Sequence, residues 1–213
     1  MIFLHICKVF RNFARNFLNM TLVFASNNAH KLEEVRAIMP EGIDVLSLRE
    51  IGFEDDIDET GTTLEANSLI KADTIRQWLT THPQPKTIDG IFADDTGLEI
   101  EALNGAPGVY TARWAGEPAA NRAKALCELA GKTNRNAQFR TVITLIKNGQ
   151  TQQVEGIVRG KMAEAEYGHG GFGYDPVFIP EGYEKTFAEL PAETKNSISH
   201  RARALTELVK ILR

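Results

Sequence analysis

Hydrophobic and polar positions alternate along the chain in blocks that predict strands, loops and helices. Residues 21–25 form a short, β-rich apolar run that is typical of a buried strand. A polar break at residues 26–28 follows, and the apolar spacing over residues 30–39 predicts a helix that ends at Pro40. Strand, polar loop and helix in this order direct backbone N–H groups and a helix N-terminus beyond the end of the strand, where an anion could bind.

A second helix is predicted after the acidic segment of residues 54–65. Thr62 and Glu65 have the spacing of a capping box, and the apolar stripe that follows extends to about Leu79. Lys71 falls on this stripe, where a lysine needs a reason because lysines are rarely buried. It either extends past the edge of the core or meets a phosphate, and the pattern leaves both interpretations open.

The rest of the chain continues the alternation of strands and helices. Residues 98–102 alternate apolar and polar positions, as a half-exposed strand does, and residues 118–130 predict a helix. Residues 138–147 and 152–161 flank Asn148-Gly149, which is a strong hairpin signal. A last amphipathic helix is expected after Ser199. The predicted fold class is therefore α/β.

Two adjacent carboxylates are the most informative chemical feature. Asp94 and Asp95 follow the apolar run of residues 90–93 and precede Thr96-Gly97, a pattern that predicts a strand ending at a site. Two carboxylates held close together repel each other, so a cation must offset their charge, and Mg²⁺ is the simplest candidate. The alternative is a solvated acidic turn.

A glycine-rich stretch is the second dense motif. Four of the six residues 168–173 are glycine, which permits positive φ angles and the close approach of a ligand. Phe172 within it offers a flat face on which a base could stack. His200 and Arg201 precede the last apolar stripe; taken alone, they are ordinary polar residues of a first helical turn.

Composition and charge narrow the function classes. The 213 residues are 43% hydrophobic and 24% charged, which is ordinary for a soluble globular protein. The net charge is −4, and the chain without its first 20 residues holds 21 basic and 28 acidic residues. Such a body is poorly suited to a long nucleic-acid backbone, but a local basic pocket could bind a phosphorylated small molecule. Two cysteines suit a reducing compartment and cannot form a metal cluster.

The first 20 residues differ from the rest, being rich in phenylalanine and basic residues and free of acids. No apolar run approaches the roughly 18 residues that span a bilayer. We interpret this segment as a non-functional or disordered extension, with Met20 as the working start and residues 21–213 as the domain. An organellar presequence or membrane-surface helix is the alternative interpretation.

Seven motifs, in order, resemble the inosine triphosphate pyrophosphatase family, also called the Ham1 family, whose members remove non-canonical purine nucleotides. The motifs occupy residues 26–31, 59–61, 65–71, 93–98, 105–113, 170–176 and 197–201. The resemblance runs from about residue 21 to the C-terminus and implies an elongated mixed β-sheet with flanking helices, forming two lobes around a central substrate cleft. It also implies a homodimer. Together with the charge and composition, this leads us to expect a cytoplasmic protein with a small-molecule substrate and with no nucleic-acid or membrane partner.

The implied reaction is Mg²⁺-dependent hydrolysis of ITP, dITP or XTP to the monophosphate and pyrophosphate. By the resemblance, Asp95, Asp94 and Lys71 are catalytic, while Glu59 and Asp95 hold Mg²⁺, with Asp94 as a further candidate. The implied substrate-binding residues are Ser26, Asn27, Asn28, Ala29, His30, Lys31, Thr96, Phe172, Gly173, Tyr174, Asp175, Lys195, His200 and Arg201. The alternatives are a Maf-like pyrophosphatase or phosphatase acting on other nucleotides, and a non-catalytic nucleotide sensor.

Overall fold

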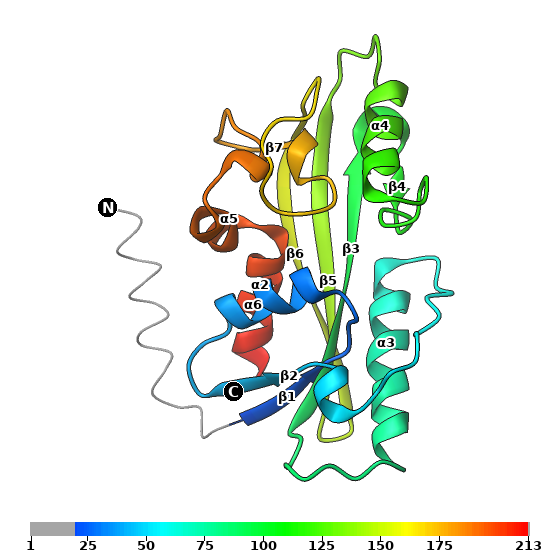
Figure 1. Cartoon of the computed structure of the whole chain (residues 1–213), viewed down its shortest axis with the longest axis vertical. Helices are drawn as coiled ribbons and strands as arrows, with labels where there is room; N and C mark the ends of the chain where they lie inside the picture. Colours follow the sequence, from blue (N-terminus) through cyan, green and yellow to red (C-terminus); the bar gives the residue numbers. More distant parts are fainter. Residues whose placement is uncertain (1–19, 213) are drawn as a thin grey trace.

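The computed structural model describes residues 20–212 and contains one seven-stranded mixed β-sheet with five α-helices (Figure 1). The strands are β1 (Met20–Phe24), β2 (Ile43–Leu46), β3 (Gly90–Ile100), β4 (Pro107–Gly108), β5 (Asn136–Lys147), β6 (Gln150–Met162) and β7 (Phe178–Pro180). The helices are α2 (Ala29–Ile38), α3 (Leu64–Leu79), α4 (Pro118–Glu128), α5 (Ala192–Ile198) and α6 (His200–Ile211). The α/β prediction is thereby confirmed.

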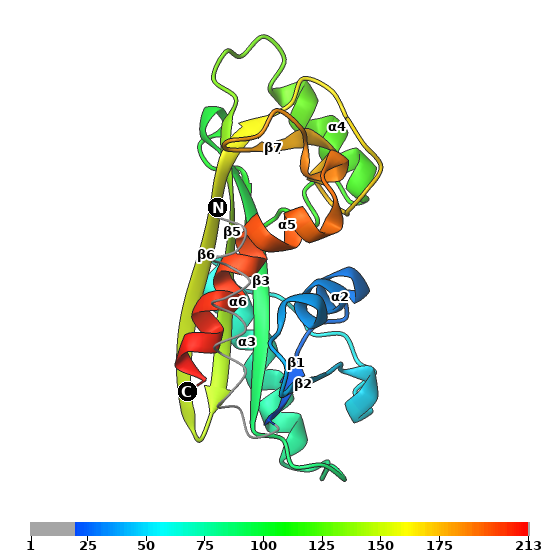
Figure 2. The same cartoon turned by 90° about the vertical axis from the view of Figure 1, so that its left-hand side faces the viewer.

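The strand order is β2-β1-β3-β5-β6-β7, and β4 pairs with β3. The pairs of β1 with β2 and with β3 are parallel, and all the others are antiparallel. Figure 2 shows the long strands β3, β5 and β6 running along most of the molecule. Helix α4 and β7 lie at one end of these strands, and β1 and β2 lie at the other.

Helices cover both faces of the sheet. On one face, Phe92 and Ile143 belong to a core that includes Leu205 of α6 and Val35 of α2. On the other face, Ile91 and its neighbours pack with residues of α3. Since successive side chains of a strand point to opposite faces, the even-numbered residues of β3 face α6 and the odd-numbered ones face α3.

Strand β3 does not end at the acidic pair, as the sequence pattern suggested. It runs through Asp94 and Asp95 to Ile100, and each of residues 91–100 pairs with β5. The prediction of a strand end at this point was wrong, because each carboxylate finds its own buried cations, as described below. Charge compensation thus overrides the low strand propensity of aspartate.

On its other side, β3 has a gap in its pairing. Strand β1 pairs with β3 only as far as Phe92, and β4 pairs only with Leu98 and Glu99. Between these two contacts, residues 93–97 have no strand partner on that side within the described part of the chain. The open edge brings both faces of the sheet to one place, where a ligand can reach side chains from each.

Most local predictions agree with the observed elements. The predicted strand at 21–25, the helices at 30–39 and 118–130, and the hairpin are all present within one or two residues of their ends. Asn148 and Gly149 both have positive φ, at 52° and 74°, as a two-residue hairpin turn requires. One cap was misplaced: Thr63, not Thr62, is the N-cap of α3, and its side chain accepts a hydrogen bond from the Ala66 amide.

Predictions about residues 1–19 lie outside the described residues. Met20 itself is the first residue of β1, and its amide donates to the Gly42 carbonyl at 2.9 Å. None of the helices within residues 20–212 has the length and apolar character needed to cross a membrane.

Candidate active site

A cavity of about 620 Å³ lies at the open edge of β3. Of the residues that the sequence singled out for the site, all except Ala29 and Asp94 line it. Those lining residues are Ser26, Asn27, Asn28, His30, Lys31, Glu59, Lys71, Asp95, Thr96, Phe172, Gly173, Tyr174, Asp175, Lys195, His200 and Arg201. The fold therefore gathers segments from both ends of the chain around one space.

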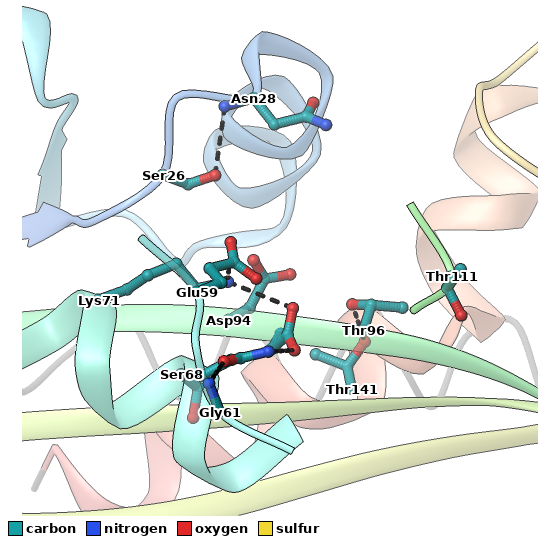
Figure 3. A network of polar contacts seen from close by, with 12 residues as sticks. Ser26, Asn28, Glu59, Gly61, Ser68, Lys71, Asp94, Thr96, Thr111 and Thr141 are labelled. Atoms are coloured by element: carbon teal, nitrogen blue, oxygen red, sulfur yellow. Dashed lines mark hydrogen bonds and ion pairs between the residues drawn. The ribbon is translucent and has the colours of Figure 1, made fainter. Parts of the chain in front are cut away.

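Asp95 lies on the α3 side of the cavity, where its carboxylate contacts Lys71. The Lys71 Nζ donates to Asp95 Oδ1 at 3.2 Å and to Glu59 Oε1 at 2.9 Å, and Asn67 Nδ2 lies 3.4 Å from Asp95 Oδ2. Figure 3 shows Lys71 and Glu59 side by side above the strands. The Gly61 amide donates to Asn67 Oδ1, and a Cβ at position 61 would collide with that same oxygen. The close approach thus requires glycine.

Burial and neighbouring charges shift the pKa values of both Lys71 and Asp95. Burial raises the pKa of Asp95, and the nearby Lys71 and Lys31 offset this only in part. Burial acts to lower the pKa of Lys71, but Asp95, Glu59 and Asp94 outweigh it, so that the pKa is raised. Lys71 is therefore a buried, charged ammonium group that touches two carboxylates at the wall of the cavity.

Asp94 lies on the opposite face of the sheet and is only 1% exposed. Its Oδ1 accepts from Lys31 Nζ and its Oδ2 from Arg201 Nε, both at 2.9 Å. Burial would raise the pKa of Asp94, but Lys31, Arg201 and Lys71 outweigh it and hold the pKa well below its usual range. Asp94 thus anchors two cations from beneath the cavity.

The turn between β1 and α2 presents a helix N-terminus to the cavity. Asn28 is the N-cap of α2, and its side chain accepts from the Lys31 amide at 3.1 Å. The Ser26 hydroxyl in turn accepts from the Asn28 amide at 3.3 Å, and Figure 3 shows the two residues joined above β3. A capped helix N-terminus beside the Lys31 ammonium group is a favourable place for phosphate.

The glycine-rich loop forms the other end of the cavity. Asp175 Oδ2 accepts from the Phe172 amide at 2.7 Å and from Lys195 Nζ at 2.6 Å. A Cβ at Gly171 would collide with the same carboxylate, so glycine is needed here too. The Lys195 Nζ lies 4.8 Å from the centre of the Phe172 ring. Asp175 therefore fixes an aromatic face and a cation next to each other.

His200 and Arg201 are buried, at 5% and 1% exposed, and are not ordinary polar residues of a first helical turn. His200 Nδ1 bonds to Thr141 Oγ1 at 2.6 Å, and Thr141 bonds to Thr96 Oγ1 at 2.8 Å. Burial, with Arg201 and Lys195 nearby, holds the pKa of His200 well below its usual value. His200 is therefore neutral at physiological pH, with Nε2 left for a ligand.

A second cavity of about 730 Å³ lies elsewhere on the sheet, near β6 and β7. Its charged residues include Glu99, Arg159 and Lys161, and none of the predicted site residues lines it. We assign the site to the smaller cavity, because the buried ionisable groups with displaced pKa values gather there.

Comparison with known proteins identifies the family of this chain. The sequence model of the Ham1 family matches residues 22–211. The chain belongs to the Ham1 family. A dITP/XTP pyrophosphatase of Flavobacterium johnsoniae is 48% identical over 196 residues, which cover 91% of this chain and 98% of that protein. A dITP/XTP pyrophosphatase of Porphyromonas gingivalis is 49% identical over 191 residues, covering 88% and 94%.

Solved structures of the Ham1 family have the same fold. The Ham1 protein of Staphylococcus aureus superimposes with a TM-score of 0.78 at 39% identity, covering 90% of this chain and 97% of that one. The resemblance that the seven motifs indicated is therefore confirmed.

The Ham1 fold brings together a donor set that fits Mg²⁺. Glu59 and Asp95 converge on one ammonium group, that of Lys71, so their oxygens already share one cation. Within residues 20–212, no group of three or more acidic, histidine or cysteine residues could hold a metal. Two carboxylates without a complete protein cage suit Mg²⁺, which is commonly held by one or two carboxylates together with substrate phosphates and water.

The sequence pattern did not single out three residues that contact the predicted site residues. Glu34 bonds to Lys195 Nζ at 2.7 Å and also to Arg201, so it ties α2 to α5 and α6. Arg122 donates to the Gly173 carbonyl at 3.0 Å and also contacts Glu166. These two contacts of Arg122 hold the glycine-rich loop. Thr141 orients His200. Glu34 gave one signal, its helical spacing from Lys31, whereas the other two gave none.

Proposed function

We propose that this chain hydrolyses non-canonical purine nucleoside triphosphates, namely dITP, ITP and XTP, to the monophosphate and pyrophosphate. The observation that carries the proposal is the set of residues that line the cavity at the open edge of β3. Lys31, Lys71 and the buried Asp95 face its middle, while Phe172 and the donors around it form one end. The names of the relatives that match this chain support the same reaction.

The phosphate chain of the substrate would lie between the two lysines. Lys71 Nζ stands beside Asp95, and Lys31 lies at the N-terminus of α2 on the other wall. A triphosphate carries several negative charges, so its hydrolysis depends mostly on positioning and on charge stabilisation. The backbone N–H groups of the first turn of α2 would add to the charge that the lysines supply.

Glu59 and Asp95 would hold Mg²⁺, which when bound would supply further positive charge for the phosphates. Asp95 is also placed to orient a water molecule or accept its proton. Its carboxylate borders the cavity, where a bound substrate and a water molecule would meet it. For release of pyrophosphate, the water must reach the α-phosphorus.

Asp94, by contrast, would position Lys31 and Arg201 without contacting the substrate.

The base would stack on Phe172 and be read by donors at its edge. Lys195, Arg201 and the free Nε2 of His200 offer N–H groups or a ring nitrogen near that face. Hypoxanthine and xanthine carry a 6-oxo acceptor, whereas adenine carries a 6-amino donor. A site built to donate to the oxo group leaves its own donors unpaired against adenine, and such mismatches discriminate by about 10⁴ or more.

The test is product analysis on a panel of ITP, dITP, XTP, GTP and ATP, with Mg²⁺ and with a chelator. We expect monophosphate and pyrophosphate from the first three substrates, little turnover of ATP, and loss of turnover with the chelator. Orthophosphate as the first product would contradict the proposal, and so would binding of ITP without any turnover in Mg²⁺.

A further inference from the structure

The imidazole of His30 stacks on the ring of Phe172. The ring centres are 5.5 Å apart and the planes differ by 13°. His30 belongs to the first turn of α2, whereas Phe172 belongs to the glycine-rich loop, and both residues line the same cavity. The stack therefore joins the phosphate side of the cavity to the base side.

The His30 side chain is otherwise 65% exposed to solvent. Its Nδ1 lies 3.8 Å from Glu33 Oε2 on the same helix. An exposed imidazole that nevertheless lies parallel to an aromatic ring gains from the stacking itself, which favours offset parallel rings at 4.5–7 Å.

The spacing of the two rings has a consequence for a bound base. Carbon atoms in contact lie about 3.5–4.0 Å apart, so two rings that enclose a third stand about 7 Å apart or more. The His30 and Phe172 rings are closer than this, at 5.5 Å. Entry of a base between them requires the His30 side chain to swing outward, which its exposure allows, while Asp175 keeps the Phe172 backbone in place.

We propose that His30 forms the second aromatic wall of the base site, so that the purine is held between the His30 and Phe172 rings. In the free protein the two walls close on each other. The inference rests on the proposed function, since it takes Phe172 as the surface on which the base stacks. It assigns the His30 ring to the base, and leaves phosphate binding to Lys31 and to the backbone of α2.

Calorimetric titration of the full chain with IMP and with inorganic tripolyphosphate tests this assignment. Stacking contributions predict that His30→Ala weakens IMP binding by about 5- to 100-fold. Tripolyphosphate has no base, so its affinity should stay within about twofold of the wild-type value. His30→Phe should retain IMP binding, whereas His30→Lys, which keeps a basic group but loses the ring, should resemble His30→Ala. Thermal unfolding of each variant controls for folding.

Each other outcome has a distinct meaning. Unchanged IMP affinity in His30→Ala would overturn the second wall. Tighter IMP binding would mean that His30 only covers Phe172 and competes with the base, which also overturns the proposal. Equal losses for IMP and tripolyphosphate would make His30 a phosphate ligand. If the wild type binds tripolyphosphate but shows no binding of IMP, the proposed base site itself fails, and the second wall fails with it.

Discussion

The Asp94 and Asp95 carboxylates are adjacent in sequence but lie on opposite faces of the β-sheet. Asp94 contacts Lys31 and Arg201 on the α6 side, and Asp95 contacts Lys71 on the α3 side. They do not form one acidic pair that needs a shared metal. Each has its own cations, and only Asp95 borders the cavity. The two acids should therefore behave differently when they are changed.

Asp94→Asn should chiefly destabilise the protein. It leaves the charges of Lys31 and Arg201 buried without their shared partner, and breaking a buried ion pair in this way costs about 3–5 kcal/mol. Urea denaturation at pH 7 measures the loss. A change of less than about 1 kcal/mol would contradict the anchoring role of Asp94.

Asp95→Asn should chiefly abolish turnover. Loss of general-base assistance alone costs roughly 10²–10⁴ in rate. Stability should fall less than in Asp94→Asn, because Lys71 keeps Glu59 as a partner. The comparison uses kcat at saturating Mg²⁺ on folded protein. Near-normal turnover would show that Asp95 has been misassigned.

Variants of Lys71 and Arg201 should distinguish phosphate binding from base recognition. Lys71→Ala should weaken the binding of every nucleoside triphosphate alike, because in the proposed function Lys71, beside Asp95, contacts the phosphates and not the base. Arg201→Lys keeps the buried charge but alters the donors beside Phe172, so it should narrow the ratio of kcat/KM for ITP over ATP. Uniform losses across all bases in both variants would mean that the two roles cannot be separated.

Glu34→Gln should weaken recognition of the base indirectly, through Lys195 and Arg201. Glu34 holds both Lys195 and Arg201, so loss of its charge should misplace these donors and raise KM for ITP. Binding of inorganic tripolyphosphate, which does not use the base end, should change little. Glu41→Gln, at an exposed position just after α2, is the matched control and should have no effect.

His200 should make stability depend on pH between 5 and 6.5. The folded protein keeps His200 neutral, whereas in the unfolded chain it takes up a proton near pH 6.5. Below that pH the unfolded state binds more protons, so stability falls as the pH is lowered, by up to about 1.4 kcal/mol per pH unit. Asp94 contributes in the same direction only below about pH 4, since its lowered pKa lies beneath the ordinary aspartate value.

The variant His200→Asn isolates this contribution, because asparagine can still bond to Thr141 but does not titrate. Denaturation curves at pH 5.0 and 6.5 should differ less in the variant than in the wild type. Equal pH dependence in both proteins would contradict a buried, neutral His200.

Local signals predicted most of the fold. The hairpin around Asn148-Gly149 and the helices that begin near residues 30 and 118 depend on neighbouring residues, so their patterns are visible in the sequence. The sequence pattern predicted too short a strand at β3, because two adjacent aspartates disfavour a strand. Their compensation comes from Lys31, Lys71 and Arg201, which lie on three other elements.

The contacts within the candidate site could not be predicted from local sequence patterns to the same extent. Alternation along a strand already implies that adjacent residues face opposite ways, but that rule applies only once the strand is known to continue through Asp94 and Asp95. The contact of Glu34 with Lys195 joins residues 161 positions apart. No local pattern encodes such a pair, so the support beneath the base end became visible only in three dimensions.

A competition between dITP and dATP tests both the base preference and the phosphorus atom that water attacks. Equal concentrations of dITP and dATP are incubated with the full chain and Mg²⁺ in ¹⁸O-labelled water, and the products are analysed by mass spectrometry. We expect that dITP is consumed first, that one ¹⁸O atom enters dIMP, and that pyrophosphate is released unlabelled. Equal consumption of the two substrates, label in pyrophosphate, or orthophosphate as the first product would contradict it.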